Sequence, residues 1–270
     1  MTYISHTDKQ YFDAIDLILQ TGEEHSDRTG VGTKRIFGHT FKFDLEKEFP
    51  VITCKPAAFK NSIRELLFFL GGDSSFEALQ AQGGTLSKWW LPWFKDGSLG
   101  PLYPKQWRNF NGQGVDQIKN VVDKLKTNKT SRRIAFTSFN PVEVDIPLIW
   151  PCHSCFNQLM VSNDNKLHMS TLSRSQDLGI GTPANWILYA TLLHMFAKVS
   201  DLNVGTLTYF VNDLHIYSNH IEALKTMERQ TYSSPALHLT PKDNIDEYTL
   251  DDFKLLNYKA GPKIKLPMAV

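Results

Sequence analysis

Hydrophobic residues recur along this chain with two periods, and these periods divide it into predicted helices and strands. Helical spacing, with apolar residues three or four positions apart, covers the ranges 8–20, 59–70, 116–126 and 182–200. The last of these is apolar on nearly all sides, which indicates a helix at the centre of the molecule. A further helix is expected to follow the segment 213–220 and to reach about residue 230.

Strands are predicted where polar and apolar residues alternate with a period of two. They cover 35–43, 134–139, 156–161, 167–172 and 205–212, and a short strand is expected at 49–53. Turn residues at 162–165 separate two of these strands, which predicts an antiparallel hairpin. No repeat, low-complexity tract or linker interrupts the pattern, so the whole of 1–270 is expected to be a single domain.

The range 83–100 combines turn residues with aromatic side chains and is expected to be a loop. Trp89, Trp90, Trp93 and Phe94 all fall within it. Aromatic rings in a loop suit a wall against a flat ligand, and a cluster that faces the protein core is an equally available interpretation.

Composition narrows the classes of partner. Lys and Arg total 29 against 28 for Asp and Glu, so no overall basic field attracts nucleic acid or an anionic membrane. The cysteines Cys54, Cys152 and Cys155 are odd in number, which favours a reducing compartment over a disulfide framework. Cys152 and Cys155 lack a second pair of zinc ligands, so no metal site is expected. Without an export signal or an apolar run of about 20 residues, a cytoplasmic protein is expected.

The main candidate for chemistry is Cys152, which precedes one strand of the predicted hairpin. Arg174 and Ser175 follow its partner strand, so antiparallel pairing brings them close to the thiol. A thiolate attacks electron-poor carbon, and an Arg beside a Ser suits a phosphate. Asn185, in the first turn of the long helix, offers a donor and an acceptor to a pyrimidine edge. A small buried hydrophobic Cys is the structural alternative.

Further candidates each have a structural alternative as well. Glu65 lies among apolar residues of a helix, where it either faces solvent or has a raised pKa suited to proton transfer. Arg28 lies in a glycine-rich loop that either closes on a phosphate or is simply solvated. His215 and Tyr217 lie two apart in an extended segment, so both can bind one ligand group.

Arg132 and Arg133 stand next to each other at the start of a predicted strand. Adjacent side chains on a strand point to opposite faces, so both can hardly reach one phosphate of their own chain. The pair therefore indicates a subunit interface.

These motifs together resemble the thymidylate synthase family across nearly the whole chain. In the family's order they are Asp27-Arg28-Thr29-Gly30, Ser131-Arg132-Arg133, Pro151-Cys152-His153, Arg174-Ser175-x-Asp177, Gly181-x-Pro183-x-Asn185 and His215-x-Tyr217-Ser218-Asn219-His220. The resemblance implies an α+β fold with a six-stranded mixed sheet at a homodimer interface and helices on the other face. It also implies transfer of a one-carbon unit from 5,10-methylenetetrahydrofolate to dUMP, with no nucleic acid required.

The resemblance assigns roles around the nucleotide. Cys152 would add to C6 of the pyrimidine and make C5 a nucleophile for the methylene carbon. The implied phosphate ligands are Arg28, Arg174, Ser175 and, from the neighbouring subunit, Arg132 and Arg133. His215 and Tyr217 would bind the sugar 3′-hydroxyl. Asn185 would accept from N3–H and donate to O4, which matches uracil, whereas relatives that act on cytosine tend to carry Asp there.

Proton transfer and folate binding are implied in the same way. Glu65 would run a proton relay near O4, Tyr103 would assist removal of the C5 proton, and Asp177 would contact the pterin. The implied folate-binding residues are Leu86, Ser87, Trp90, Asp177, Ile180, Gly181, Ala184 and Val270.

The chain departs from the family mainly on the folate side. Ser87 stands in place of a Trp, Ala184 of a pterin-contacting Phe, Gly179 of a bulky residue, Pro56 of a basic residue, Trp150 of a small residue and Asn157 of a common Gln. After the folate leaves, the methylene on C5 takes either hydride, giving a methyl group, or water, giving a hydroxymethyl group. Hydride transfer needs a pterin stacked over the methylene.

Ser87 in place of Trp therefore favours attack by water on the methylene, which predicts a deoxyuridylate hydroxymethylase. This resembles the branch of the family that some viruses use to make modified DNA bases, for which the site of action would be the host cytoplasm. Trp89, Trp93 and Trp150 could replace the missing Trp as the stacking surface for the pterin, which keeps thymidylate synthase as the alternative.

Two other classes of protein are less well supported. A catalytically silent relative that binds nucleotide or RNA is disfavoured by the intact Cys152 and Glu65. A hydrolase built on Cys152 and His153 is weakly supported, because neighbours on a strand face opposite ways.

Overall fold

The structure is a computed structural model that describes residues 4–269. The helices are α1 (His6–Thr21), α2 (Phe59–Gly71), α3 (Phe76–Ala81), α4 (Leu86–Trp90), α5 (Tyr103–Arg108), α6 (Gln117–Thr127), α7 (Gly181–Val199) and α8 (Ile221–Thr226), with short 3-10 turns η1 (Leu91–Trp93), η2 (Ser218–His220), η3 (Ile245–Glu247) and η4 (Leu250–Asp252). The strands are β1 (Glu23–His25), β2 (Thr33–Asp44), β3 (Ala135–Phe136), β4 (Phe156–Val161), β5 (Lys166–Asp177), β6 (Asn203–Tyr217), β7 (Ala236–Leu239) and β8 (Phe253–Leu256). No helix within these residues is both long and apolar enough to cross a membrane.

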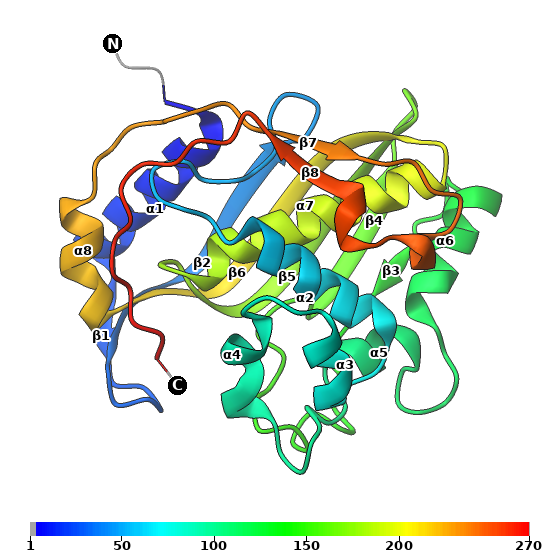
Figure 1. Cartoon of the computed structure of the whole chain (residues 1–270), viewed down its shortest axis with the longest axis horizontal. Coiled ribbons are helices and arrows are strands. Elements are labelled where there is room, and N and C mark those ends of the chain that lie inside the picture. Colours follow the sequence, from blue (N-terminus) through cyan, green and yellow to red (C-terminus); the bar gives the residue numbers. More distant parts are fainter. Residues whose placement is uncertain (1–3, 270) are drawn as a thin grey trace.

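Six strands form one mixed sheet in the order β1-β2-β6-β5-β4-β3 (Figure 1). β5 and β6 are parallel, and the other neighbouring pairs are antiparallel. The α+β fold, its mixed sheet and the β4–β5 hairpin are therefore confirmed. The register sets Ser175 beside Asp213 and Asp177 beside His215, so polar residues of two strands meet at one end of the sheet.

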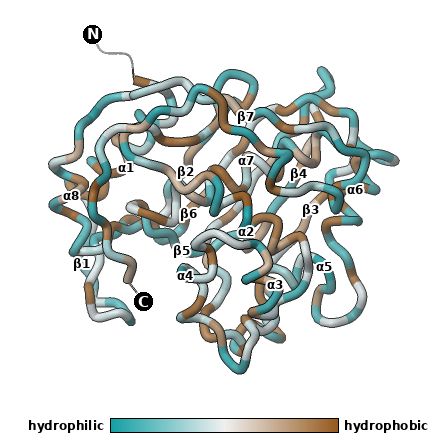
Figure 2. The backbone as a smooth tube through the Cα atoms, in the orientation of Figure 1, coloured by the Kyte–Doolittle hydropathy of each residue, from teal (hydrophilic) through white to brown (hydrophobic). Residues whose placement is uncertain are grey.

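The core lies between the sheet and the helices on one of its faces. α7 is buried along almost its whole length, as its composition predicted. Its Trp186 packs against Phe41 and Phe43 of β2, with ring centroids 4.7 and 4.9 Å apart. α2 packs on α7, and hydrophobic stretches of α2 run through the interior while hydrophilic segments are common in the outer loops (Figure 2).

The other face of the sheet exposes apolar side chains. Phe156 and Met160 of β4 and Phe210 of β6 are 49%, 59% and 41% exposed. The register aligns Phe156, Leu172 and Phe210 across three neighbouring strands. A contiguous apolar row of this kind is characteristic of a surface that another protein covers.

The range 49–53 is not a strand, although its apolar residues are buried. The backbone N–H of Thr53 donates to Asp8 Oδ1 at 2.8 Å, and its carbonyl accepts from Gly261 N at 2.8 Å. Asp8 is fully buried and also accepts from the hydroxyls of Thr53 and Thr231. Its carboxylate replaces sheet pairing as the partner of this segment.

Three further expectations about secondary structure are wrong. The range 83–100 is not only a loop, because it contains α4 and η1. Of the predicted strand 134–139 only β3 pairs, since Thr137 N donates to the Gln117 side chain instead of to a strand. The helix after β6 ends at Thr226, where Met227 turns to an extended conformation.

Candidate active site

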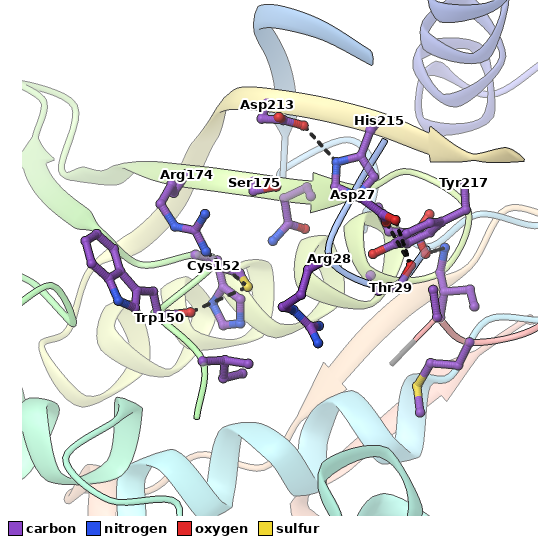
Figure 3. A pocket seen from close by; sticks show the side chains of 18 of the residues that line it. Asp27, Arg28, Thr29, Trp150, Cys152, Arg174, Ser175, Asp213, His215 and Tyr217 are labelled. Carbon is purple, nitrogen blue, oxygen red and sulfur yellow. Dashed lines mark hydrogen bonds and ion pairs between the residues drawn. The ribbon is translucent and has the colours of Figure 1, made fainter. Parts of the chain in front are cut away.

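A cleft of about 700 Å³ opens beside the ends of β5 and β6 and the start of α7 (Figure 3). Its lining includes Arg28, Arg35, Glu65, Trp89, Trp90, Trp93, Tyr103, Trp150, Cys152, Arg174, Ser175, Gln176, Asp177, Ile180, Gly181, Ala184, Asn185, Asp213, His215, Tyr217, Met268 and Ala269. Most of the site residues predicted from sequence therefore share one cavity, although the chain carries them on widely separated elements.

Cys152 lies in the loop before β4, where two hydrogen bonds fix its backbone. Its carbonyl accepts from Arg174 N at 2.7 Å, and its N–H donates to the Tyr103 hydroxyl at 2.7 Å. The thiol lies 3.9 Å from Arg174 Nη2, and Arg28 lines the same cavity (Figure 3). Burial raises the pKa of Cys152, whereas the charges of Arg174 and Arg28 lower it. The two guanidinium groups thus favour the reactive thiolate.

His153 lines the same cleft as Cys152, but its ring is held by aromatic residues of the core. Its Nδ1 lies 2.5 Å from the Tyr189 hydroxyl, and its ring stacks on Tyr103 with centroids 4.4 Å apart. Burial lowers the pKa of His153 to about 3. The His153 Nδ1 contacts the Tyr189 hydroxyl and the Cys152 thiol contacts Arg174, so the structure offers no support for the Cys–His hydrolase alternative.

Arg28, Arg174 and Ser175 line the same cavity, as an anion site requires. The loop that carries Arg28 is closed by Asp27, whose carboxylate accepts from Gly32 N at 3.2 Å. Gly32 has φ +81°, a left-handed conformation that glycine adopts without strain. The Arg28 guanidinium lies 4.9 Å from the centre of the Trp93 ring, a cation–π contact that holds it at the cleft.

Arg132 and Arg133 are exposed and do not line the cleft of their own chain. Their backbone carbonyls accept from Gln158 and Lys124, and this fixes the segment without using either guanidinium. Neither guanidinium is therefore placed to bind a ligand in the cleft of its own chain.

Asn185 is 6% exposed, and a second amide orients it. Its Nδ2 donates to Gln176 Oε1 at 2.9 Å, so one N–H and the Oδ1 acceptor remain for a ligand. A donor and an acceptor side by side match one edge of uracil. Gln176 was not singled out from sequence, although its place between Ser175 and Asp177 was the available signal.

The predicted sugar-binding pair is supported by two charged residues that sequence reasoning missed. His215 Nδ1 lies 2.8 Å from Asp213 Oδ1, and Arg35 Nη1 donates to Asp213 Oδ2 at 2.8 Å. With Asp213 as acceptor, the proton of neutral His215 is on Nδ1 and Nε2 is left to accept from a ligand hydroxyl. Tyr217 lies edge-on to His215 at 5.2 Å. Only the pairing of β2 with β6 brings Arg35 opposite His215.

The start of α7 forms another wall of the cleft. Asp177 accepts from Gly179 N at 2.8 Å and Ile180 N at 3.1 Å, and this fixes the turn into the helix. Gly181 and Ala184 line the cavity with little side-chain bulk, and Ile180 adds an apolar side chain.

Three of the predicted folate residues are placed differently from the rest. Leu86 is fully buried in the core, because it points inward from α4, and Ser87 is not among the lining residues. Val270 lies outside the described residues, whereas Met268 and Ala269 next to it line the cleft. Trp89, Trp93 and Trp150 also line the cleft.

Comparison with known proteins places this cleft in a family. The family model for thymidylate synthase matches residues 9–270. The chain belongs to the thymidylate synthase family. A similar protein is the bifunctional dihydrofolate reductase-thymidylate synthase of Paramecium tetraurelia, which is 39% identical over 287 residues. That match covers 98% of this chain and 62% of the relative, so the chain spans less than two thirds of the relative's length.

Thymidylate synthases are one-carbon transferases that use 5,10-methylenetetrahydrofolate, and the residues present fit a reduced pterin. Asp177 provides carboxylate oxygens that can accept from pterin N–H groups, and Ile180 and Ala184 provide apolar contact. In this member of the thymidylate synthase family these residues would hold the pterin near Cys152, which lines the same cavity.

Glu65 lines the cleft and is 6% exposed. Burial raises its pKa to about 7, although the Trp90 Nε1–H donates to its Oε1 at 2.6 Å and favours the charged form. A carboxyl that titrates near neutral pH can both give and take a proton, which suits the expected relay.

We expect Glu65→Gln to stabilise this thymidylate synthase relative at alkaline pH while it impairs catalysis. An unfolded Glu has a pKa of about 4.3, so ionisation of the buried group costs the folded wild type stability as the pH rises from about 4 through 7. The variant keeps an acceptor for Trp90 and avoids this cost, which amounts to about 4 kcal/mol above pH 7. Urea unfolding at pH 5 and pH 8.5 measures the difference, and equal stability of the two proteins at both values would contradict it.

Proposed function

We propose that this chain, acting as one domain, transfers a one-carbon unit to C5 of dUMP through a covalent adduct with Cys152. The observation that carries the proposal is that the thiol, two guanidinium groups and the oriented amide of Asn185 share one cavity. The arginines suit a phosphate, the amide suits uracil, and the thiol is placed where it can attack the ring between them.

The side chains of the cleft account for ring activation. The Cys152 thiolate adds to C6, so the Sγ–C6 bond forms and the C5–C6 π electrons move toward C5 and O4. The free N–H of Asn185 stabilises charge at O4, and Glu65 supplies a proton there. Methylenetetrahydrofolate supplies the carbon that C5 captures, and also a hydride when the product is a methyl group. Tyr103, next to Cys152, assists loss of the C5 proton before the Sγ–C6 bond breaks.

We further propose that the product is 5-hydroxymethyl-dUMP. Ser87 gives α4 no ring in place of the family's Trp, and three cleft tryptophans have other partners: Trp90 binds Glu65, Trp93 lies under Arg28, and Trp150 donates to Asp145 at 2.9 Å. A pterin that is not clamped exposes the methylene on C5 to water, which adds its oxygen there. Formation of dTMP is the second candidate, because Trp89, Trp93 and Trp150 do line the cleft.

Product analysis tests this choice. We expect mass spectrometry of a reaction with dUMP and methylenetetrahydrofolate to detect the hydroxymethyl product and tetrahydrofolate. Ser87→Trp should restore a stacking surface and raise the ratio of methyl to hydroxymethyl product by about tenfold or more. Lys88→Trp, one exposed position away, is the matched control. A wild type that yields only dTMP and dihydrofolate would refute the hydroxymethylase assignment.

We also propose that the chain acts as a homodimer joined through the exposed face of its sheet. Phe156, Met160 and Phe210 supply the apolar surface, and Arg132 and Arg133 are free to reach the phosphate site of the other subunit. This arrangement explains why two adjacent arginines are exposed on a chain whose own cleft they do not enter.

A further inference from the structure

His220 connects the segment 262–269 to the cleft. It follows β6, is fully buried, and its Nε2 lies 2.7 Å from the carbonyl oxygen of Pro267. The next two residues, Met268 and Ala269, line the cavity. The segment has no regular secondary structure and passes α8 on its way to the cleft (Figure 1). The Pro267 contact is therefore placed to hold an otherwise irregular segment against the site.

The other ring nitrogen of His220 faces the start of α7. Nδ1 lies 3.6 Å from Asp177 Oδ1, the carboxylate that also binds Gly179 N and Ile180 N. Nδ1 is buried without a hydrogen bond at normal distance. The imidazole thus stands between two parts of the cleft wall that the sequence carries far apart.

Gly179 makes this approach possible. A Cβ built at residue 179 would lie 2.7 Å from His220 Nδ1 and 3.2 Å from Asp177 Oδ1. Any larger residue there would push the imidazole away from the carboxylate. The substitution of glycine for a bulky residue at this position, noted from the sequence, thus has a specific steric consequence.

The charge state of the ring decides how well both contacts are made. The carbonyl of Pro267 only accepts, so Nε2 must carry a proton. A neutral ring then turns the Nδ1 lone pair toward the Asp177 carboxylate, which is repulsive. A protonated ring donates from both nitrogens and satisfies both acceptors.

We propose that His220 is a positioning residue that, when protonated, joins Pro267 to Asp177 and so holds the segment 262–269 against the folate side of the cleft. The contacts themselves do not depend on substrate. Their effect on folate affinity rests on the function proposed above.

The groups around His220 set the direction of its pH dependence. Burial opposes protonation, but the Asp177 carboxylate 3.6 Å from Nδ1 and the carbonyl of Pro267 outweigh it, so the pKa of His220 is raised above its ordinary value. Lys55 opposes protonation, and the Tyr217 ring lies edge-on at 5.7 Å. Because the folded pKa is above the unfolded value of about 6.5, the connection is complete below that pH and is lost as the pH rises through the folded pKa.

Hydrogen exchange of the free protein, followed by mass spectrometry, tests the proposal. After correction for intrinsic exchange rates, we expect wild-type 262–269 to exchange about tenfold more slowly at pH 6 than at pH 9, the size expected of one charge-assisted hydrogen bond. His220→Gln keeps a donor for Pro267 but carries no charge, so its protection should not change with pH. Gly179→Ala keeps the histidine but displaces it, so the segment should exchange faster at pH 6. The interior of α7 serves as the folding control.

Several results would overturn the proposal. One is that the protection of 262–269 in the wild type does not change with pH. Another is that protection in His220→Gln changes with pH as it does in the wild type. A third is that Gly179→Ala protects the segment at pH 6 as well as the wild type does. If a variant also loses protection in α7, its fold is disturbed and NMR titration of His220 in the wild type provides the test. A pKa of His220 that is not raised would exclude the proposed link between Pro267 and Asp177. In turnover, His220→Gln should raise KM for methylenetetrahydrofolate more than it lowers kcat. Hydrogen exchange is measured without substrate, so it tests the role of His220 even if the proposed function is wrong.

Discussion

Replacement of Cys152 by serine is expected to lower turnover by at least about a thousandfold and to abolish the covalent adduct with dUMP. A hydroxyl in the same place is a far weaker nucleophile than a thiolate stabilised by Arg174 and Arg28. Intact-protein mass spectrometry after incubation with dUMP and methylenetetrahydrofolate detects the adduct, and release of tritium from C5 measures turnover.

Cys155→Ser is the matched control for this change. Cys155 lies three residues further along and does not line the cleft, so its replacement should leave both readouts near the wild-type level. An adduct that persists in Cys152→Ser, or disappears in Cys155→Ser, would show that the wrong sulfur has been assigned.

The Cys152→Ser variant also probes the proposed dimer. A chain with Arg132→Ala and Arg133→Ala should bind dUMP poorly, and so should be nearly inactive, because its neighbour's phosphate site loses two ligands. Mixed with Cys152→Ser chains, it should regain activity, since one site of each heterodimer then has the thiol from one chain and the arginines from the other. No recovery after exchange of subunits would contradict action across the interface.

Replacement of Asn185 by aspartate is expected to shift the preferred base from uracil toward cytosine, with a change of several powers of ten in the ratio of kcat/KM for dUMP to that for dCMP. The site is buried, so a mismatched ligand edge leaves polar groups unpaired. Gln176 now accepts from Asn185 Nδ2, and it has to turn its own N–H groups toward a carboxylate in the variant.

Asn185→Ala supplies the comparison, because it removes both hydrogen-bonding groups and should weaken both substrates without reversing the order. Steady-state kinetics on dUMP and dCMP separates the outcomes. An Asn185→Asp variant that keeps the wild-type preference would show that another residue recognises the base.

Much of this fold was predictable because its large elements carry strong periodic signals. The apolar helix over 182–200 and the hairpin around 162–165 were found nearly in full, as α7 and the β4–β5 pair. The short elements failed for a physical reason. The range 49–53 has the composition of a strand, but its hydrogen bonds go to Asp8 and to distant backbone, which no local pattern records.

The site shows the same division between local and distant information. Cys152, Arg174 and Asn185 stand in short motifs, and the cleft brings them together. Arg35 and Asp213 support His215 only because β2 pairs with β6, and Leu86 turns into the core because of where α4 packs. Such residues become recognisable once strand order and helix placement are known.

The order of strands has a consequence for how the chain is made. β2 is complete at Asp44, yet its long partner β6 begins only at Asn203 and lies in the middle of the sheet. A nascent chain on the ribosome therefore carries β2 with one hydrogen-bonding edge open until most of the sequence has been translated. We expect folding to be largely post-translational, slowed by this distant pairing, and assisted by chaperones that shield the open edge.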